Sequence, residues 1–239
     1  MNVDLSYCKV LDEMFKEKKL VGLKGKNFDG LEAASTLNNL FLLRELIKEY
    51  KPIHTLEIGM AFGASTLAII STLKEQLEYD VNSKIHVAID PFQRTIWDST
   101  GIMSVQKAGL SNHFDLIEDF SYNTLPDLLH KGRKFDLVYI DGSHLFEDVF
   151  IDFFYLSKML NPLGLLLFDD STDNNVNKVI RFILRNFKET YQPIDTFHYY
   201  SNFDYLKRRM VNFMRKNQLT VFRKIGKSDR EWNSKYKSF

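Results

Sequence analysis

The stretch Thr55-Leu-Glu-Ile-Gly-Met-Ala-Phe-Gly-Ala-Ser-Thr-Leu-Ala68 has the pattern of a strand, a glycine turn and the start of a helix. Apolar residues lead into Glu57, and Gly59 and Gly63 allow the backbone to bend tightly and to approach a ligand closely. Ser65 or its neighbouring threonine can cap the helix that follows. The pattern therefore predicts a turn on which a cofactor can lie.

Strand and helix patterns alternate along the chain around this turn, as in a parallel sheet with helices on both faces. The predicted strands cover residues 54–58, 84–89, 114–118, 135–140 and 164–168, and the predicted helices cover residues 64–78, 100–110, 123–131, 145–160 and 173–188. We therefore predict an α/β fold with a doubly wound sheet. Ligands of such folds bind at the carboxyl ends of the strands.

The N-terminal part has a different pattern. Residues 4–20 look like an amphipathic helix, residues 24–30 are rich in loop residues, and a second helix is expected over residues 31–50 before Pro52. We predict a helical cap over residues 1–34 and one main domain over residues 35–239.

Composition favours a soluble protein of the cytoplasm. Hydrophobic residues make up 44% and charged residues 26% of the 239 positions, enough apolar material for a substantial core. Cys8 is the only cysteine, so an intramolecular disulfide framework is excluded. The first residues lack the pattern of a signal peptide, and every apolar run is shorter than a membrane span requires.

The charge is unevenly distributed along the chain. Residues 201–239 contain 11 basic and 3 acidic residues, which leaves residues 1–200 with an excess of 7 acidic residues. Within this end, residues 203–216 have the pattern of a basic amphipathic helix, for which packing on its own domain is the default. A substrate lid, a homodimer contact and a membrane-surface contact remain open. Nucleic acid is disfavoured as a substrate because the larger part of the chain is acidic.

Acidic side chains lie at or just past the carboxyl end of each predicted strand. Asp90 ends the second strand, where a carboxylate can accept hydrogen bonds from the two hydroxyls of a ribose. Taken alone, Asp90 could equally be a turn residue before Pro91. The glycine turn upstream favours the ribose interpretation.

Asp141, Asp169 and Asp170 follow two successive predicted strands. If these strands are neighbours, three carboxylates converge at one edge of the sheet, and they repel one another unless a cation lies among them. Oxygen ligands suit a hard divalent ion, with Mg²⁺ first and Mn²⁺ or Ca²⁺ open. The alternative is that Asp169 and Asp170 form only a polar turn.

His144 lies three residues after Asp141, and a neutral imidazole at this position can accept a proton near neutral pH. The alternative is that His144 caps the following helix. The other five histidines lack comparable neighbours in the sequence, and we interpret them as surface or turn residues: His54, His86, His113, His130 and His198.

Three segments together resemble the class I S-adenosylmethionine-dependent methyltransferases: Glu57-Ile-Gly-Met-Ala-Phe-Gly-Ala-Ser65, Ala88-Ile-Asp-Pro-Phe92 and Phe135-Asp-Leu-Val-Tyr-Ile-Asp-Gly-Ser-His144. The similar branch contains the metal-dependent catechol-type and macrolide-sugar O-methyltransferases, and the resemblance covers roughly residues 35–190. It implies a Rossmann-like sheet of seven strands, mostly parallel, with an antiparallel edge formed by residues 191–199 and 219–225.

The resemblance also implies roles for individual residues. The methionine end of the cofactor would lie on the turn, at Gly59, Ala61, Gly63 and Ser65, with Glu57 at its amino group. Asp90 would hold the ribose, and Ser121 or Asp119 would lie near the adenine. The metal would lie at Asp141, Asp169 and Asp170, and Asp141 and His144 would be catalytic, with His144 in the position of a general base. One departure is Ala61, where many class I enzymes have a glycine.

The predicted function is therefore O-methylation of a small hydroxylated acceptor, a sugar or a secondary metabolite, with S-adenosylmethionine and a divalent cation. One alternative is an NAD(P)-dependent oxidoreductase, although the nicotinamide fingerprint needs a glycine series that this turn lacks. Another is a non-catalytic cofactor-binding protein on the same scaffold.

Overall fold

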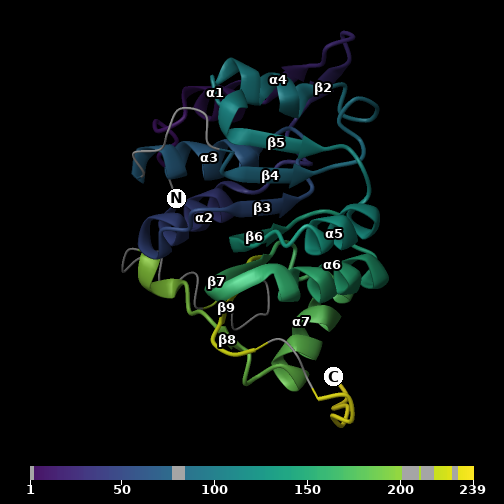
Figure 1. Cartoon of the computed structure of the whole chain (residues 1–239). Coiled ribbons are helices and arrows are strands. Elements are labelled where there is room, and N and C mark those ends of the chain that lie inside the picture. The colour runs from purple at the N-terminus through teal and green to yellow at the C-terminus, as the bar shows by residue number, and fades with distance from the viewer. Residues whose placement is uncertain (1–2, 77–83, 201–209, 211–217, 228–230) are drawn as a thin grey trace. The chain divides into compact units, whose positions relative to one another are not determined.

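The computed structural model describes residues 3–76, 84–200, 210, 218–227 and 231–239. The chain forms two compact units, Met1–Phe120 and Ser121–Phe239, which are described in turn (Figure 1).

The first unit contains a three-stranded parallel sheet. Its strands are β3 (Thr55–Ile58), β4 (His86–Ile89) and β5 (Phe114–Ile117), and β4 pairs with both of the others. All eight residues of β3 and β4 are buried. The helices are α1 (Lys9–Glu17), α2 (Leu37–Tyr50), α3 (Ala64–Gln76) and α4 (Thr100–Lys107), with a 3₁₀ turn at Ser111–His113. Strands 54–58, 84–89 and 114–118 were thus predicted to within two residues.

The N-terminal region differs from the predicted helical cap. α2 begins at Leu37 rather than residue 31, because the Thr36 hydroxyl accepts a hydrogen bond from the Asn39 amide and caps the helix there. Between α1 and α2 lies an antiparallel hairpin of β1 (Lys19–Val21) and β2 (Asn27–Asp29), where a loop was expected.

The buried side chain of Asp98 holds this hairpin. Its Oδ2 accepts hydrogen bonds from the amides of Lys24 (2.9 Å) and Lys26 (3.1 Å). Phe28 of β2 also packs edge to face on Phe62 of the glycine turn, with the ring centroids 5.2 Å apart. These contacts join residues more than 30 positions apart, so local sequence patterns could not have predicted the hairpin.

The second unit contains a four-stranded sheet in the order β6-β7-β9-β8. Its strands are β6 (Phe135–Ile140), β7 (Leu160–Phe168), β8 (Tyr191–Pro193) and β9 (Thr220–Lys224), and its helices are α5 (Ser121–His130), α6 (Phe146–Met159) and α7 (Asn174–Asn186). β6 and β7 are parallel, whereas β9 runs antiparallel to both β7 and β8. The predicted antiparallel edge is confirmed.

Two predictions for the second unit differ from the structure, and a third falls almost entirely on residues that the structure does not describe. β7 begins at Leu160, four residues before the predicted strand. Only Tyr191–Pro193 of the segment 191–199 is a strand, and Phe197–Tyr199 form a 3₁₀ turn. The basic helix predicted over residues 203–216 lies outside the described residues, apart from Met210.

Three strands in the first unit and four in the second make up the seven that the sequence predicted for the main sheet. Within the described ranges, none of the helices is both long enough and apolar enough to cross a bilayer.

Candidate active site

The glycine turn follows β3 directly and takes a left-handed course. Gly59 has φ 87° and Gly63 has φ 82°, values that glycine adopts without steric cost. A Cβ at Gly63 would lie 3.2 Å from the carbonyl oxygen of Gly101, so a larger residue would also crowd α4. Ala61 has φ 44°, and the turn therefore keeps a left-handed backbone where many class I enzymes have a glycine.

Asp90 follows β4, and its carboxylate accepts hydrogen bonds from the backbone of this turn. Its Oδ2 accepts hydrogen bonds from the amides of Met60 (3.1 Å) and Ala61 (2.8 Å) and from Gln93 Nε2 (3.0 Å). Its Oδ1 accepts one from the Phe92 amide at 2.8 Å. The side chain is only 3% exposed. Since a carboxylate oxygen has about two acceptor positions, Oδ1 retains capacity for one more donor.

Glu57 lies in a buried polar group beneath the turn. Its Oε1 accepts a hydrogen bond from the Thr66 hydroxyl and lies 3.2 Å from His86 Nε2. The His86 Nδ1 in turn lies 2.8 Å from the Thr55 hydroxyl. His86 was interpreted as a surface or turn residue, and that interpretation was wrong: the side chain is fully buried. Glu57 Oε2 is buried and without a hydrogen-bond partner among the described residues.

The residues expected at the adenine lie at the end of β5. Asp119 is exposed, and its Oδ1 accepts a hydrogen bond from the Phe120 amide at 2.7 Å. Phe120 and Phe92 form an edge-to-face pair with centroids 5.7 Å apart, and both rings remain partly exposed. Ser121 begins α5 in the second unit, where its side chain bonds to the buried Asp152.

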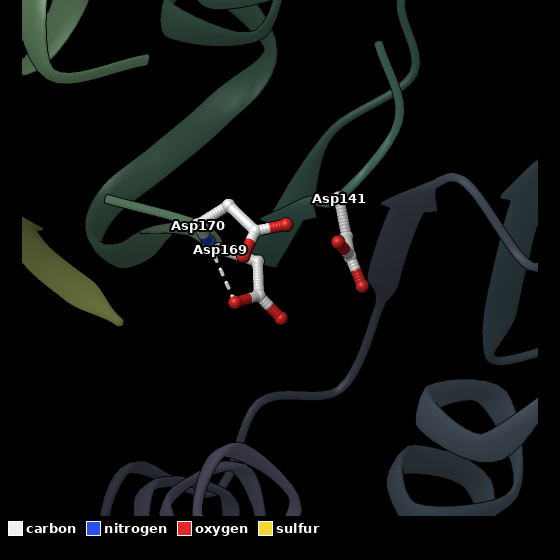
Figure 2. A group of neighbouring side chains, drawn as sticks. All are labelled: Asp141, Asp169 and Asp170. Atoms are coloured by element: carbon white, nitrogen blue, oxygen red, sulfur yellow. Dashed lines mark hydrogen bonds between the residues drawn. The ribbon is translucent and has the colours of Figure 1, made fainter. Parts of the chain in front are cut away.

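Asp141, Asp169 and Asp170 come together at the carboxyl ends of β6 and β7, as Figure 2 shows. Each offers a carboxylate oxygen, and the three oxygens lie within 4.8 Å of one another. The register explains this: Ile140 pairs with Phe168, so the next residue of each strand lies side by side with its counterpart.

Two contacts orient Asp169 within this acidic trio. Its Oδ2 accepts a hydrogen bond from the buried Tyr139 hydroxyl. Its Oδ1 accepts one from the Asp170 amide at 2.6 Å, the dashed line in Figure 2. Asp170 itself has φ 44°, a left-handed conformation that aspartate adopts more readily than most residues other than glycine.

His144 joins the acidic trio through its side chain. Its Nε2 lies 3.0 Å from Asp170 Oδ2, and the imidazole remains about half exposed. Asn175 near the start of α7 donates a hydrogen bond to the His144 carbonyl oxygen at 3.0 Å, which holds the loop before α6. The α6 N-cap residue is Leu145, so His144 is not the cap of that helix.

Several site residues were missed by sequence reasoning. Phe92 and Phe120 each follow a strand-end acid by one or two positions, a signal that the sequence carried. Tyr139 lies within the continuous buried run at the end of β6, and it gave no signal because tyrosine is common in strands. His86 is the first residue of β4, where pairing with Thr55 across the sheet is visible only in the fold.

The residues fit the groups that the resemblance implies. For the cofactor, the buried and unpartnered Glu57 Oε2 suits an ammonium group, and the remaining acceptor capacity of Asp90 suits a hydroxyl. For the cation, three clustered carboxylates form the all-oxygen donor set that Mg²⁺ or Ca²⁺ prefers.

Comparison with known proteins agrees with this geometry. Residues 56–171 match a family model described as a methyltransferase domain. No curated protein gives a significant match.

Solved structures share the fold across nearly the whole chain. An O-methyltransferase from Bacillus cereus in complex with S-adenosylhomocysteine has a TM-score of 0.62 at 13% identity, covering 91% of each chain. The O-methyltransferase TomG from Streptomyces achromogenes, in complex with S-adenosylmethionine, has a TM-score of 0.60 at 17% identity, covering 93% of this chain and 91% of its own. A methyltransferase from Podospora anserina, bound to S-adenosylhomocysteine, has a TM-score of 0.57 at 17% identity, with 91% and 88% coverage.

The seven-stranded Rossmann-like fold predicted from the sequence is thus confirmed. Residues 56–171 match the model of a methyltransferase domain, which confirms the predicted resemblance to the class I S-adenosylmethionine-dependent methyltransferases.

Proposed function

We propose that this chain transfers a methyl group from S-adenosylmethionine to a hydroxyl of a small molecule, and that a divalent cation, Mg²⁺ first, takes part. The observation that carries the proposal is the acidic trio with His144 beside it, at the carboxyl ends of two strands of a methyltransferase domain. A structural role alone gives no reason to gather three carboxylates and an imidazole at one point.

The first unit supplies the binding groups for the cofactor, whose sulfonium provides the reactive methyl group. The left-handed turn from Gly59 to Gly63 brings backbone close to the methionine end, and Glu57 Oε2 accepts from its ammonium. Asp90 holds the turn and offers Oδ1 to one ribose hydroxyl. Phe92 and Phe120 form an apolar wall for the adenine, beside Asp119.

The second unit supplies the groups for the acceptor hydroxyl. Asp141, Asp169 and Asp170 hold the cation, which when bound makes a nearby hydroxyl more acidic. Tyr139 and the Asp170 amide fix Asp169 so that its carboxylate needs little reorganisation.

His144 is the general base in this proposal. With Asp170 accepting from Nε2–H, the neutral imidazole carries its lone pair at Nδ1, and this atom takes the proton of the acceptor hydroxyl. Asp170 also steadies the imidazolium that results. Such a base contributes about 10²- to 10⁴-fold to a rate.

The acceptor in this proposal is a sugar or a secondary metabolite. The similar O-methyltransferase TomG is involved in tomaymycin synthesis, which supports a secondary metabolite. The nicotinamide alternative is not favoured, because the family match and the cofactors of the structural neighbours belong to methyl transfer.

The test is transfer of radiolabelled methyl from S-adenosylmethionine to a panel of catechols, sugars and hydroxylated metabolites. Protein treated with EDTA should be inactive, and Mg²⁺ should restore transfer. Asp169→Asn should lose the response to Mg²⁺, and His144→Gln should lower kcat by about 10²- to 10⁴-fold while still binding S-adenosylhomocysteine.

His130→Gln is the matched control, since His130 is an exposed histidine on α5. Full transfer in EDTA would refute the role of the cation, and an unchanged kcat in His144→Gln would refute the general base. Binding of the cofactor with no transfer to any acceptor would favour the non-catalytic scaffold.

A further inference from the structure

A second candidate binding site lies in the second unit, at the end of its sheet opposite the acidic trio. A pocket of about 480 Å³ opens beside the start of β6 and the early part of β7, next to the end of β9. The acidic trio follows the other ends of β6 and β7. Because β6 has six residues at ~3.3 Å each, the two sites are separated by roughly 20 Å.

The polar lining of this pocket is entirely basic. Its charged lining residues are four lysines, Lys134, Lys158, Lys224 and Lys227, and the described lining residues include no acid. The negative end of the α6 dipole offsets only about half of one of these four charges. A concave surface of one charge sign concentrates ions of the opposite sign.

Two of the four lysines also have a structural role. Lys224 is 8% exposed, and its Nζ donates hydrogen bonds to the carbonyl oxygens of Ser157 (2.9 Å) and Leu160 (2.7 Å) at the end of α6. Lys134 Nζ donates to the Lys158 carbonyl oxygen at 2.8 Å. These bonds fix two ammonium groups in the pocket wall, so part of the positive charge is held in place before any ligand arrives.

The rest of the lining is apolar and includes one strained residue. Leu163 has φ 65°, and a left-handed backbone costs a leucine about 1–2 kcal/mol. Its side chain is 57% exposed, so burial returns little of this cost. Ile225, 49% exposed, lies in the same lining. A strained and exposed leucine beside fixed cations is more consistent with a ligand contact than with a role in folding.

We propose that this pocket binds a small organic phosphate, a molecule with a phosphate for the lysines and an apolar group for Leu163 and Ile225. Lysine binds phosphate as a point charge, and the volume lies within the usual range for small-molecule sites. The proposal does not rest on methyl transfer, because the pocket lies at the opposite end of the strands from the acidic trio.

The test is isothermal titration of the full chain in EDTA with two probes, phenyl phosphate and inorganic phosphate. The parent should bind phenyl phosphate more tightly. The double variant Lys158→Gln/Lys227→Gln should bind both probes at least tenfold more weakly. The control Lys74→Gln/Lys178→Gln removes two exposed lysines on α3 and α7 and should bind like the parent.

Leu163→Gly separates the two parts of the proposal. It should keep the affinity for inorganic phosphate, lose the preference for phenyl phosphate, and raise the melting temperature because the backbone strain is relieved. Equal binding of the two probes by the parent, or equal weakening by the control pair, would overturn the proposal. So would binding to vesicles containing phosphatidylserine but not to phenyl phosphate, which would indicate a membrane surface instead.

Discussion

Asp152 on α6 gives the most quantitative prediction about the stability of the fold. Its side chain is 1% exposed, its Oδ1 lacks a hydrogen-bond partner among the described residues, and α6 packs against α5. Burial raises the pKa of this carboxyl to about 7, the Ser121 hydroxyl opposes the rise, and Asp148 one turn away adds to it. Asp152→Asn removes the ionisable group and keeps the shape.

The direction and the size of the pH effect on stability follow from the difference in proton binding between the folded and the unfolded chain. The pKa of Asp152 is about 7 in the folded chain, compared with 3.8 for an unperturbed aspartate. Between these pH values the native state therefore holds a proton that the unfolded chain releases. Stability therefore falls as pH rises through this range. The difference of about 3 in pKa, at about 1.4 kcal/mol each, corresponds to about 4 kcal/mol lost above pH 7.

The assay is urea unfolding of the parent and Asp152→Asn at pH 5 and at pH 8. The free energy of unfolding of the variant minus that of the parent should be about 3 kcal/mol larger at pH 8 than at pH 5. Other titrating groups cancel in this comparison because both proteins contain them. Asp127→Asn, an exposed carboxyl on α5, is the control and should show parallel profiles. Parallel profiles for Asp152→Asn as well would refute a buried carboxyl that holds its proton.

Three further predictions concern the first unit, which in our proposal binds the cofactor. Asp90→Ala should weaken S-adenosylhomocysteine binding at least tenfold in calorimetry, because two amides of the turn and two donors just after β4 lose their acceptor; unchanged affinity would contradict this role. Ala61→Gly should raise the free energy of unfolding by about 1 kcal/mol, since φ 44° is unstrained for glycine, and a loss of stability would show that the turn is relaxed with alanine. Phe92→Ala should weaken adenosine-containing ligands and leave methionine binding unchanged in equilibrium dialysis, whereas equal weakening of both would place the ring elsewhere in recognition.

Local patterns predicted the elements that carry the site. The strand ends at Ile58, Ile89 and Ile140 were predictable because apolar runs stop at a glycine or an acid there. Asp141 and Asp169 could be predicted as neighbours because parallel strands end at one edge, and the register of β6 and β7 brings them together.

What escaped prediction depends on contacts between distant residues. The β1–β2 hairpin depends on Asp98, more than 70 positions away. The burial of His86 depends on Glu57 and Thr55 of the neighbouring strand. Asp90 was predicted as a ribose ligand, and its hydrogen bonds to the turn amides depend on a backbone path that single residues do not reveal.

The central claim is the proposal that this chain binds both a sulfur cofactor and a divalent cation. The most direct measurement is thermal denaturation of EDTA-treated protein with S-adenosylmethionine, S-adenosylhomocysteine, NAD⁺ or NADP⁺, each with and without Mg²⁺. A ligand at a hundred times its Kd stabilises a fold by about 2.7 kcal/mol, which raises Tm by a few degrees. We expect the sulfur cofactors to raise Tm and Mg²⁺ to increase that rise. A rise with NAD⁺ or NADP⁺ alone, or a rise with the sulfur cofactors that Mg²⁺ leaves unchanged, would contradict the claim.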